Sequence, residues 1–378
     1  LEHIVPDMYE GSSDILNSDK GAFDHYMLKE IEEQPSVIRN IIQHYENEFG
    51  EITLDETMIK DITSSDRIYI IAAGTSMHAG MLGKRYLETL SEIPTEVHIA
   101  SEFAYHLPLL SSKPYFILIT QSGETADTIS AVKEIQLKGG EVHGIVNVVG
   151  SSIARLCGQG VYIHSGPEQS VASTKAFTNM VAALTLFAIR IGRTRSFSRE
   201  RGQSIIRDFE KIPNQMENYL SNQGPIEEAV ELLQDAKNVL FLGRGLSSAV
   251  AAEGALKLME VAYIPCLAYP SGEMKHGPIA LLEEGSPVVV ICPDDKHKEK
   301  TMSSVHECKA RGAKIILIHT EGDDVANEGD ISIPIPKCDE LLSPMLSVIP
   351  TQLMAYKTAL ARDCDVDRPR NLAKSVTV

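Results

Sequence analysis

Arg67–Ser76, with the sequence RIYIIAAGTS, is a short apolar run that ends in small residues. Asn238–Ser247, NVLFLGRGLS, repeats the pattern 171 positions later, so that Gly74 corresponds to Gly245. A continuous run of Ile, Val and Leu followed by small residues predicts a buried strand that enters a tight turn. The recurrence of this unit indicates an internal duplication.

Two more correspondences support the duplication. VKEIQLKGGEV at 132–142 resembles VHECKARGAKI at 305–315, and Ser-Glu-Phe at 101–103 matches Gly-Glu-Met at 272–274. Within each copy, apolar strands alternate with helical patterns, which indicates βαβ units and a parallel sheet covered on both faces. We predict two doubly wound α/β domains of about 150 residues each.

The predicted domains cover residues 63–212 and 213–364. An acidic helical segment, 1–62, precedes them, and Pro35 within it indicates a helix start. A polar helical linker is expected over 196–222. Pro350 and Pro369 are expected to break the pattern near the end, where 365–378 is predicted to be an irregular tail.

Composition limits the possible partners. The 378 residues carry a net charge of −17, of which −10 lies in residues 1–60. This balance argues against nucleic-acid and membrane-surface binding, both of which need positive fields. The apolar runs fall short of a membrane span and no signal peptide is visible, so we expect a cytoplasmic protein.

The six cysteines show no metal spacing and are expected to be structural, with a catalytic cysteine or a disulfide as the alternative.

A candidate phosphate loop follows the predicted strand 115–120. It contains Thr120, Gln121, Ser122 and Thr125 and leads into a helix, whose free amides and positive end suit a dianion. The alternative is that Ser122 only caps this helix.

Two other hydroxyl clusters belong to the same predicted edge of the sheet. One holds Thr75 and Ser76, after the preceding strand, and the other spans 171–175. Ligands in such sheets bind beyond the carboxyl ends of the strands, where these clusters are expected.

Three charges share one face of an otherwise apolar helical stretch at 246–262. Glu253, Lys257 and Glu260 are spaced i, i+4 and i+7. The alternative to a catalytic stripe is a solvated ion pair, but that predicts a broader polar face. Buried glutamates and lysines are suitable acids and bases.

Two single residues complete the candidates. His276 lies in a loop after a strand, where it could act as an acid or base or be an ordinary loop histidine. Lys374 lies in the tail, where a desolvated lysine can form a Schiff base with a keto sugar, although most terminal lysines are solvated.

Together these motifs resemble the isomerase half of the glucosamine-6-phosphate synthases (glutamine–fructose-6-phosphate amidotransferases), which is built of tandem sugar-isomerase (SIS) domains. The resemblance rests on AAGTS at 72–76, TQSGETADT at 120–128, VASTKAFT at 171–178, EGALKLMEVAYI at 253–264, GEMKHGP at 272–278 and DVDRPRNLAKSVTV at 365–378.

The resemblance implies a role for each candidate residue. Glu260 would move a proton between C1 and C2, Lys257 would assist at the sugar oxygens, and Glu253 would position them. His276 from the neighbouring subunit of a homodimer would open the sugar ring, and Lys374 would form the Schiff base. The implied substrate-binding residues are Thr75, Ser76, Thr120, Gln121, Ser122, Thr125, Val171, Ser173 and Ala373.

The resemblance also implies a reaction. Fructose 6-phosphate would be converted to glucose 6-phosphate, or with ammonia to glucosamine 6-phosphate in amino-sugar synthesis, without a metal or cofactor. The family's glutaminase domain is missing, so the chain is expected to be one part of a longer enzyme or a separate isomerase subunit. The alternatives are a non-catalytic sugar-phosphate sensor, which would not need Glu260, His276 or Lys374, and a fructosamine-6-phosphate deglycase.

Overall fold

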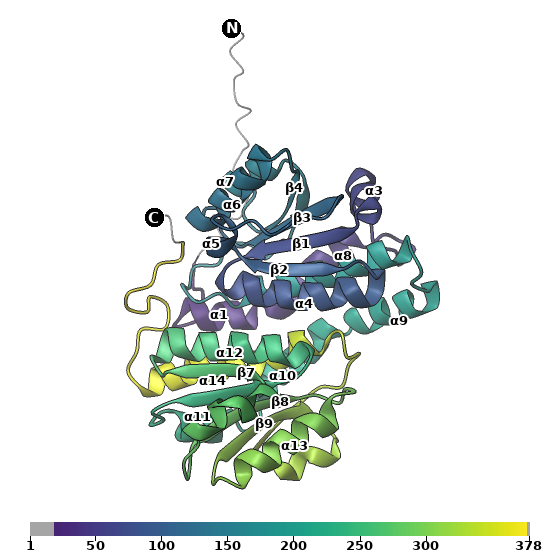
Figure 1. Ribbon diagram of the computed structural model, residues 1–378. Helices are drawn as coiled ribbons and strands as arrows, with labels where there is room; N and C mark the ends of the chain where they lie inside the picture. The colour runs from purple at the N-terminus through teal and green to yellow at the C-terminus, as the bar shows by residue number, and fades with distance from the viewer. Residues whose placement is uncertain (1–18, 376–378) are drawn as a thin grey trace.

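Two wholly parallel, five-stranded sheets lie one above the other, as the computed structural model shows (Figure 1). The model describes residues 19–375. The first 18 residues of the predicted acidic segment and the last three of the tail motif lie outside this range.

The two sheets share one strand order, which confirms the duplication. The first runs β2-β1-β3-β4-β5 and the second runs β7-β6-β8-β9-β10. The strands are β1 (Arg67–Ala72), β2 (Thr95–Ile99), β3 (Pro114–Thr120), β4 (Val142–Val146), β5 (Gly160–Tyr162), β6 (Val239–Gly243), β7 (Cys266–Pro270), β8 (Pro287–Cys292), β9 (Lys314–Thr320) and β10 (Ile331–Ile335). In each sheet the order reverses beside the first strand, which makes a topological switch point.

Helices cover both faces of each sheet, so the predicted α/β class is confirmed. In the first unit these are α4 (Gly74–Ser91), α5 (Ala100–Phe103), α6 (Ala126–Leu137), α7 (Ser152–Cys157) and α8 (Lys175–Arg193). In the second they are α11 (Ile226–Leu233), α12 (Leu246–Ala262), α13 (Lys298–Lys309) and α14 (Ser343–Ala361), with 3₁₀ turns η2 (Glu273–His276), η3 (Pro278–Leu281) and η4 (Asp324–Glu328).

The predicted helical segments outside the sheets are present. The N-terminal part holds α1 (Tyr26–Glu32), α2 (Gln34–Tyr45) and α3 (Glu56–Ser64), and Pro35 lies in the first turn of α2 as predicted. The linker forms α9 (Arg199–Phe209) and α10 (Ile212–Asn222). The N-terminal helices join both units, because α2 packs on α8 and α1 packs on α14.

The prediction that Pro350 breaks the helical pattern is wrong. Pro350 lies inside α14 and is buried. A proline within a helix removes one hydrogen bond, but α14 packs along α12 in the core, and tertiary packing outweighs local propensity there. The irregular tail begins only after Ala361.

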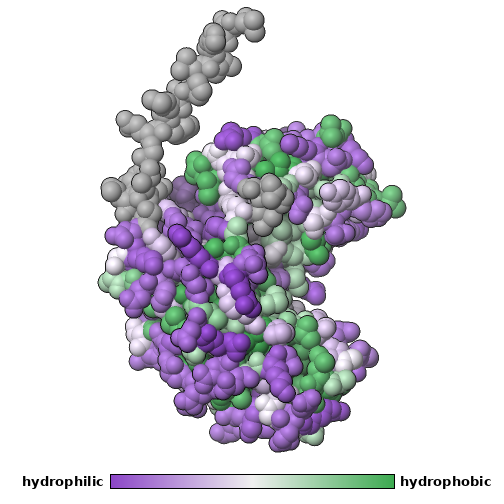
Figure 2. All heavy atoms as spheres, turned by 90° about the vertical axis from the view of Figure 1, so that its left-hand side faces the viewer, coloured by the Kyte–Doolittle hydropathy of each residue, from purple (hydrophilic) through white to green (hydrophobic). Residues whose placement is uncertain are grey.

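The layer between the two sheets contains α4 and α12, which pack against each other (Figure 1). The helix α8 packs on α4. It is apolar and long enough to span a membrane, but 94% of its apolar 18-residue window is buried within the protein. It is therefore a core helix. A space-filling view shows the surface hollowed between the upper and lower units (Figure 2).

The tail is fixed by the N-terminal helix. The Asp367 carboxylate accepts hydrogen bonds from the amides of Tyr26 and Met27, each at 2.9 Å, and so caps α1. Its carbonyl accepts a hydrogen bond from the amide of Val171. One residue thus joins the tail, α1 and the loop before α8.

Candidate functional site

A cavity of about 120 Å³ lies at the switch point of the first sheet, where the loops after β1 and β3 meet. Its lining combines these loops with the loop before α8 and the tail. The lining residues are Ala73, Thr75, Ser76, Ile119, Thr120, Gln121, Ser122, Thr125, Thr128, Val171, Ser173 and Lys374. Eight of the nine predicted substrate-binding residues are among them, whereas Ala373 is an exposed tail residue that does not line the cavity.

Two helix N-termini open onto the cavity. Neither α4 nor α6 has a side chain that hydrogen-bonds its first-turn amides, although Thr125 occupies the cap position of α6. Ser122 accepts a hydrogen bond from the amide of Glu124, two residues on, so it does not serve as the helix cap. Free first-turn amides with nearby hydroxyls form a suitable anion site.

The charged stripe of α12 is buried, as the sequence indicated. The side chain of Glu253 is 0% exposed, that of Lys257 1% and that of Glu260 22%. Lys257 Nζ lies 2.7 Å from Glu260 Oε2 and 3.4 Å from Glu253 Oε1. Although burial alone lowers the pKa of Lys257, the two carboxylates raise it further, so its net pKa shift is upward. Lys257 is therefore an ammonium group fixed between two carboxylates.

Thr75 connects this stripe to the cavity. Its hydroxyl donates to Glu253 Oε1 at 3.0 Å and accepts from Lys257 Nζ at 3.0 Å. His78, one turn further along α4, lies with Nδ1 2.7 Å from Glu253 Oε2. Burial raises the pKa of Glu253, but Lys257 and His78 lower it more, so the net shift is downward. His78 was not predicted from the sequence, although its position three residues after Thr75, at helical spacing, was an available signal.

Lys374 reaches the cavity from the tail and pairs with Glu168. Its Nζ lies 2.5 Å from Glu168 Oε2, and its side chain is 24% exposed against 0% for Glu168. Burial raises the pKa of Glu168, but Lys374 and several hydrogen bonds lower it further, so the net shift is downward. Glu168 was not predicted from the sequence either, because an isolated acidic residue in a loop carries no periodic signal.

His276 is not brought to the other candidates within one chain. It lies exposed on η2 and does not line the cavity. Within residues 19–375 its side chain has no hydrogen bond or ion pair.

The second unit lacks the equivalent anion site. Its α13 corresponds to α6, but the preceding loop carries Asp294, Asp295 and His297 in place of Ser122, Gly123 and Thr125. Two carboxylates at this turn oppose an anion. The His297 ring also packs against Gly245, where an added Cβ would lie 2.7 Å from it. The two copies thus differ in their side chains: the first carries the hydroxyl-rich loops and the second carries the charged helix.

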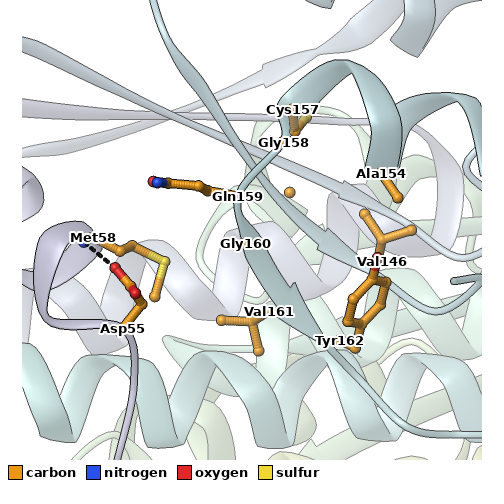
Figure 3. A pocket seen from close by; sticks show the side chains of 11 residues that line it. Asp55, Met58, Val146, Ala154, Cys157, Gly158, Gln159, Gly160, Val161 and Tyr162 are labelled. Carbon is orange, nitrogen blue, oxygen red and sulfur yellow. Dashed lines mark hydrogen bonds between the residues drawn. The ribbon is translucent and has the colours of Figure 1, made fainter. Parts of the chain in front are cut away.

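Another hollow, of about 250 Å³, lies at the β5 edge of the first sheet (Figure 3). Its lining comes from α3, β4, α7 and β5 and is mostly backbone and apolar side chains. Burial raises the pKa of the Cys157 thiol there to about 12, which makes it a poor nucleophile. All six cysteines are free, and no group of three metal-ligating side chains occurs within residues 19–375.

The fold and the cavity match a known class of protein. Residues 61–190 and 232–362 each match the SIS domain. The chain therefore belongs to the SIS-domain family, with two such domains.

Among curated proteins, the chain is similar to enzymes named glutamine–fructose-6-phosphate aminotransferase [isomerizing]. The one from Listeria monocytogenes is 46% identical over all 378 residues, and the one from Staphylococcus epidermidis is 44% identical over 373. The chain spans only 62% and 61% of these relatives' length. It corresponds to their isomerase part.

Solved structures give the same result. The C-terminal domain of glucosamine-fructose-6-phosphate aminotransferase from Francisella tularensis superposes with a TM-score of 0.88 at 36% identity, and the match covers 93% of this chain and all of that one. Tagatose-6-phosphate ketose/aldose isomerase from Escherichia coli has a TM-score of 0.75 at 18% identity, over 97% of this chain and 99% of that one, which establishes shared fold alone.

Proposed function

We propose that the chain interconverts fructose 6-phosphate and glucose 6-phosphate, and that with ammonia it converts fructose 6-phosphate to glucosamine 6-phosphate and water, a step of amino-sugar synthesis. The observation that carries this proposal is a cavity lined by hydroxyls and by Lys374, which Thr75 joins through hydrogen bonds to the buried charged stripe of α12. The names of the relatives support the same reaction.

The sugar phosphate group binds the loops after β1 and β3. Ser76, Ser122 and Thr125 offer hydroxyls, Gln121 offers an amide, and the uncapped N-termini of α4 and α6 offer backbone donors. A dianion is stabilised there despite the net charge of −17, because these donors act at contact distance.

Lys374 forms the Schiff base. Its Nζ bonds to C2 of the open-chain ketose, and the carbonyl oxygen leaves as water. Before the proton moves, ammonia displaces Nζ from C2 on the way to glucosamine 6-phosphate, or water hydrolyses the imine on the way to glucose 6-phosphate, and Lys374 is released. Lys257 is unsuited to this step, because it stays charged between two carboxylates and is fully buried.

Glu260 is the base that moves a proton between C1 and C2. One fixed carboxylate can reach two adjacent carbons, which a proton shuttle requires. The Lys257 ammonium assists proton transfer at the sugar oxygens by donating hydrogen bonds to them, and Glu253 holds Lys257 from the other side. Val171 and Ser173 contact the sugar from the loop before α8.

His276 opens the sugar ring from the neighbouring subunit of a homodimer. Two observations support this: His276 lies exposed on η2, and it is absent from the cavity of its own chain. An exposed imidazole on the surface is available to a second copy.

Isomerisation is measured by coupling glucose 6-phosphate formation to a dehydrogenase, and glucosamine 6-phosphate is measured with added ammonium. Wild-type protein should be active, and Lys374→Ala or Glu260→Gln should remove at least about 99% of the rate. Non-phosphorylated fructose is the matched substrate control. Full activity in Glu260→Gln would exclude its role as base, and cleavage of a fructosamine 6-phosphate without isomerisation would establish a deglycase instead.

Mixing two inactive variants tests the shared site. His276→Ala supplies Lys374, and Lys374→Ala supplies His276, so each heterodimer contains one complete site. Random exchange should restore about one quarter of wild-type activity. If the mixture stays inactive while exchange is verified by tagged subunits, His276 acts within its own chain or not at all.

A further inference from the structure

Behind Lys374 lie two buried carboxylates from different parts of the chain. Glu168, in the loop before α8, accepts four hydrogen bonds: Lys374 Nζ at 2.5 Å, the Ser173 hydroxyl at 2.9 Å, and the amides of Thr174 and Ala176 at 2.9 and 3.1 Å. The two amides belong to the N-terminal end of α8, which favours a negative charge. Glu168 is therefore held as an ionised carboxylate as long as Lys374 beside it is an ammonium group.

Glu30, on α1, has the opposite surroundings. It is 2% exposed, and its Oε1 accepts hydrogen bonds from the backbone amides of Gln169 and Ser170. Its Oε2 is buried and has no hydrogen-bond partner within the described part of the chain. A buried oxygen without a hydrogen-bond partner costs much free energy when it belongs to a charged carboxylate. The cost is much smaller when it belongs to a neutral, protonated carboxyl group.

The charges around Glu30 agree with this difference. Burial, followed by the charge of Glu168, raises the pKa of Glu30 to about 8, against the opposing effects of the Gln169 amide, Lys374 and Lys175. Lys175 is already paired with Glu33 at 2.7 Å. The groups facing this cluster are Glu168 before α8, Lys175 on α8, Lys374 and Asp367 in the tail, and Glu33 on the segment after α1.

We propose that Glu168 and Glu30 are positioning residues for Lys374: Glu168 is its ionised partner and proton acceptor, and Glu30 is a neutral acid that holds the Gln169–Ser170 backbone behind Glu168. This inference rests on the proposed function. It makes α1, from outside both SIS domains, a part of the isomerase site.

The proton balance follows from the geometry. Before attack, the Lys374 ammonium transfers one proton to Glu168 across their 2.5 Å contact, which leaves a neutral amine and a neutral carboxyl group. When the Schiff base forms and water leaves, the proton returns to the imine nitrogen, and Glu168 becomes its counter-ion. A neutral Glu30 permits this exchange, whereas an ionised Glu30 would add a second buried negative charge beside Glu168.

Borohydride trapping of the adduct with fructose 6-phosphate measures Schiff-base formation separately from isomerisation. We expect Glu168→Gln to lower the trapping rate at least about a hundredfold, while the Kd for inorganic phosphate changes by less than about threefold. Glu168→Asp, which keeps the charge, should recover part of the rate. Unchanged trapping in Glu168→Gln would overturn the role of Glu168.

Glu30→Gln tests the neutral acid, because an amide imitates a protonated carboxyl group. The trapping rates of this variant and the wild type should agree below about pH 7, and at pH 9 the variant should be about tenfold faster. Glu56→Gln is the matched control: it removes an exposed carboxylate that lies outside this cluster and should keep the wild-type pH profile. Identical profiles for Glu30→Gln and the wild type would overturn the role of Glu30.

Titration of the carboxyl group keeps this inference separate from the proposed function. With ¹³C-labelled glutamate, the wild type should show one carboxyl resonance that titrates near pH 8 and disappears in Glu30→Gln. If wild-type protein traps no sugar at all, the proposed function fails, and the inferred roles toward Lys374 fail with it. If trapping succeeds but the Glu30 resonance titrates near pH 4 to 5, only the neutral-acid role fails.

Discussion

The hydroxyl of Thr75, on α4 of the first SIS domain, donates a hydrogen bond to Glu253 Oε1, on α12 of the second, at 3.0 Å. The hydroxyl oxygen of Thr75 also accepts a hydrogen bond from Lys257 Nζ. One small side chain on the cavity wall thus links the anion site of one domain with the charged helix of the other. The fixed position of Lys257 depends on both domains.

Removing the Thr75 hydroxyl while keeping the shape of the side chain should uncouple the anion site of the first domain from the charged helix of the second. Thr75→Val leaves Glu253 and Lys257 each short of one hydrogen bond in a buried place, and a bond to a charged group is worth about 1.5–3 kcal/mol. We expect isomerisation to fall about ten- to hundredfold. Thr75→Ser is the control and should retain most of the activity, and equal losses in both variants would contradict the role of the hydroxyl.

Lys257 should be essential to stability as well as to activity. Lys257→Met leaves two carboxylates facing each other without a cation, and breaking a buried pair costs about 3–5 kcal/mol. We expect the Tm to fall by about 5–10 °C. The double variant Glu253→Gln/Lys257→Met should regain part of the Tm but no activity. A Tm unchanged in Lys257→Met would show that the pair contributes nothing to the fold.

Gly123 should be required in the phosphate loop. Its φ is +69°, and a Cβ there would lie 2.0 Å from the Ser151 hydroxyl and 2.5 Å from the Ser151 Cβ. Gly123→Ala must therefore displace the loop, and we expect KM for fructose 6-phosphate to rise at least about tenfold. Gly139→Ala is the matched control, because it has a positive φ but no atom within 4 Å. If both variants change KM alike, backbone strain rather than the contact with Ser151 is responsible.

Stability should fall with pH because of Glu30. Folding raises its pKa from 4.5 to about 8, mainly through burial. Between these values the folded chain holds a proton that the unfolded chain has released, so Glu30 contributes less stability as pH rises, and the loss levels off above pH 8. The Tm of Glu30→Gln relative to wild type should therefore rise between pH 5 and 8 and then stay constant. Glu56→Gln, which alters an exposed carboxylate, should give a difference that does not change with pH.

The sequence allowed the duplication and the parallel sheets to be predicted, because buried strands and small-residue turns recur at one offset. It also indicated the stripe of Glu253, Lys257 and Glu260, because helical spacing is visible in one stretch of chain. Glu168, Glu30 and His78 could not be predicted in this way. Their roles depend on contacts between segments far apart in sequence, and a single acidic or imidazole side chain has no pattern of its own.

The duplication makes a last prediction, that each chain binds one phosphate rather than two. The loop after β8 has the same place in its sheet as the loop after β3, so symmetry alone would predict two sites. Asp294 and Asp295 lie where the first copy has Ser122 and Gly123, and Asp294 pairs with Lys298 at 3.0 Å, so this lysine is already engaged. Titration calorimetry with fructose 6-phosphate should give a stoichiometry of about one per chain.

Ser122→Asp, which copies the second loop into the first, should abolish this binding, whereas Asp294→Ser should leave it unchanged. Two equivalent binding events in the wild type would contradict the division of roles between the copies.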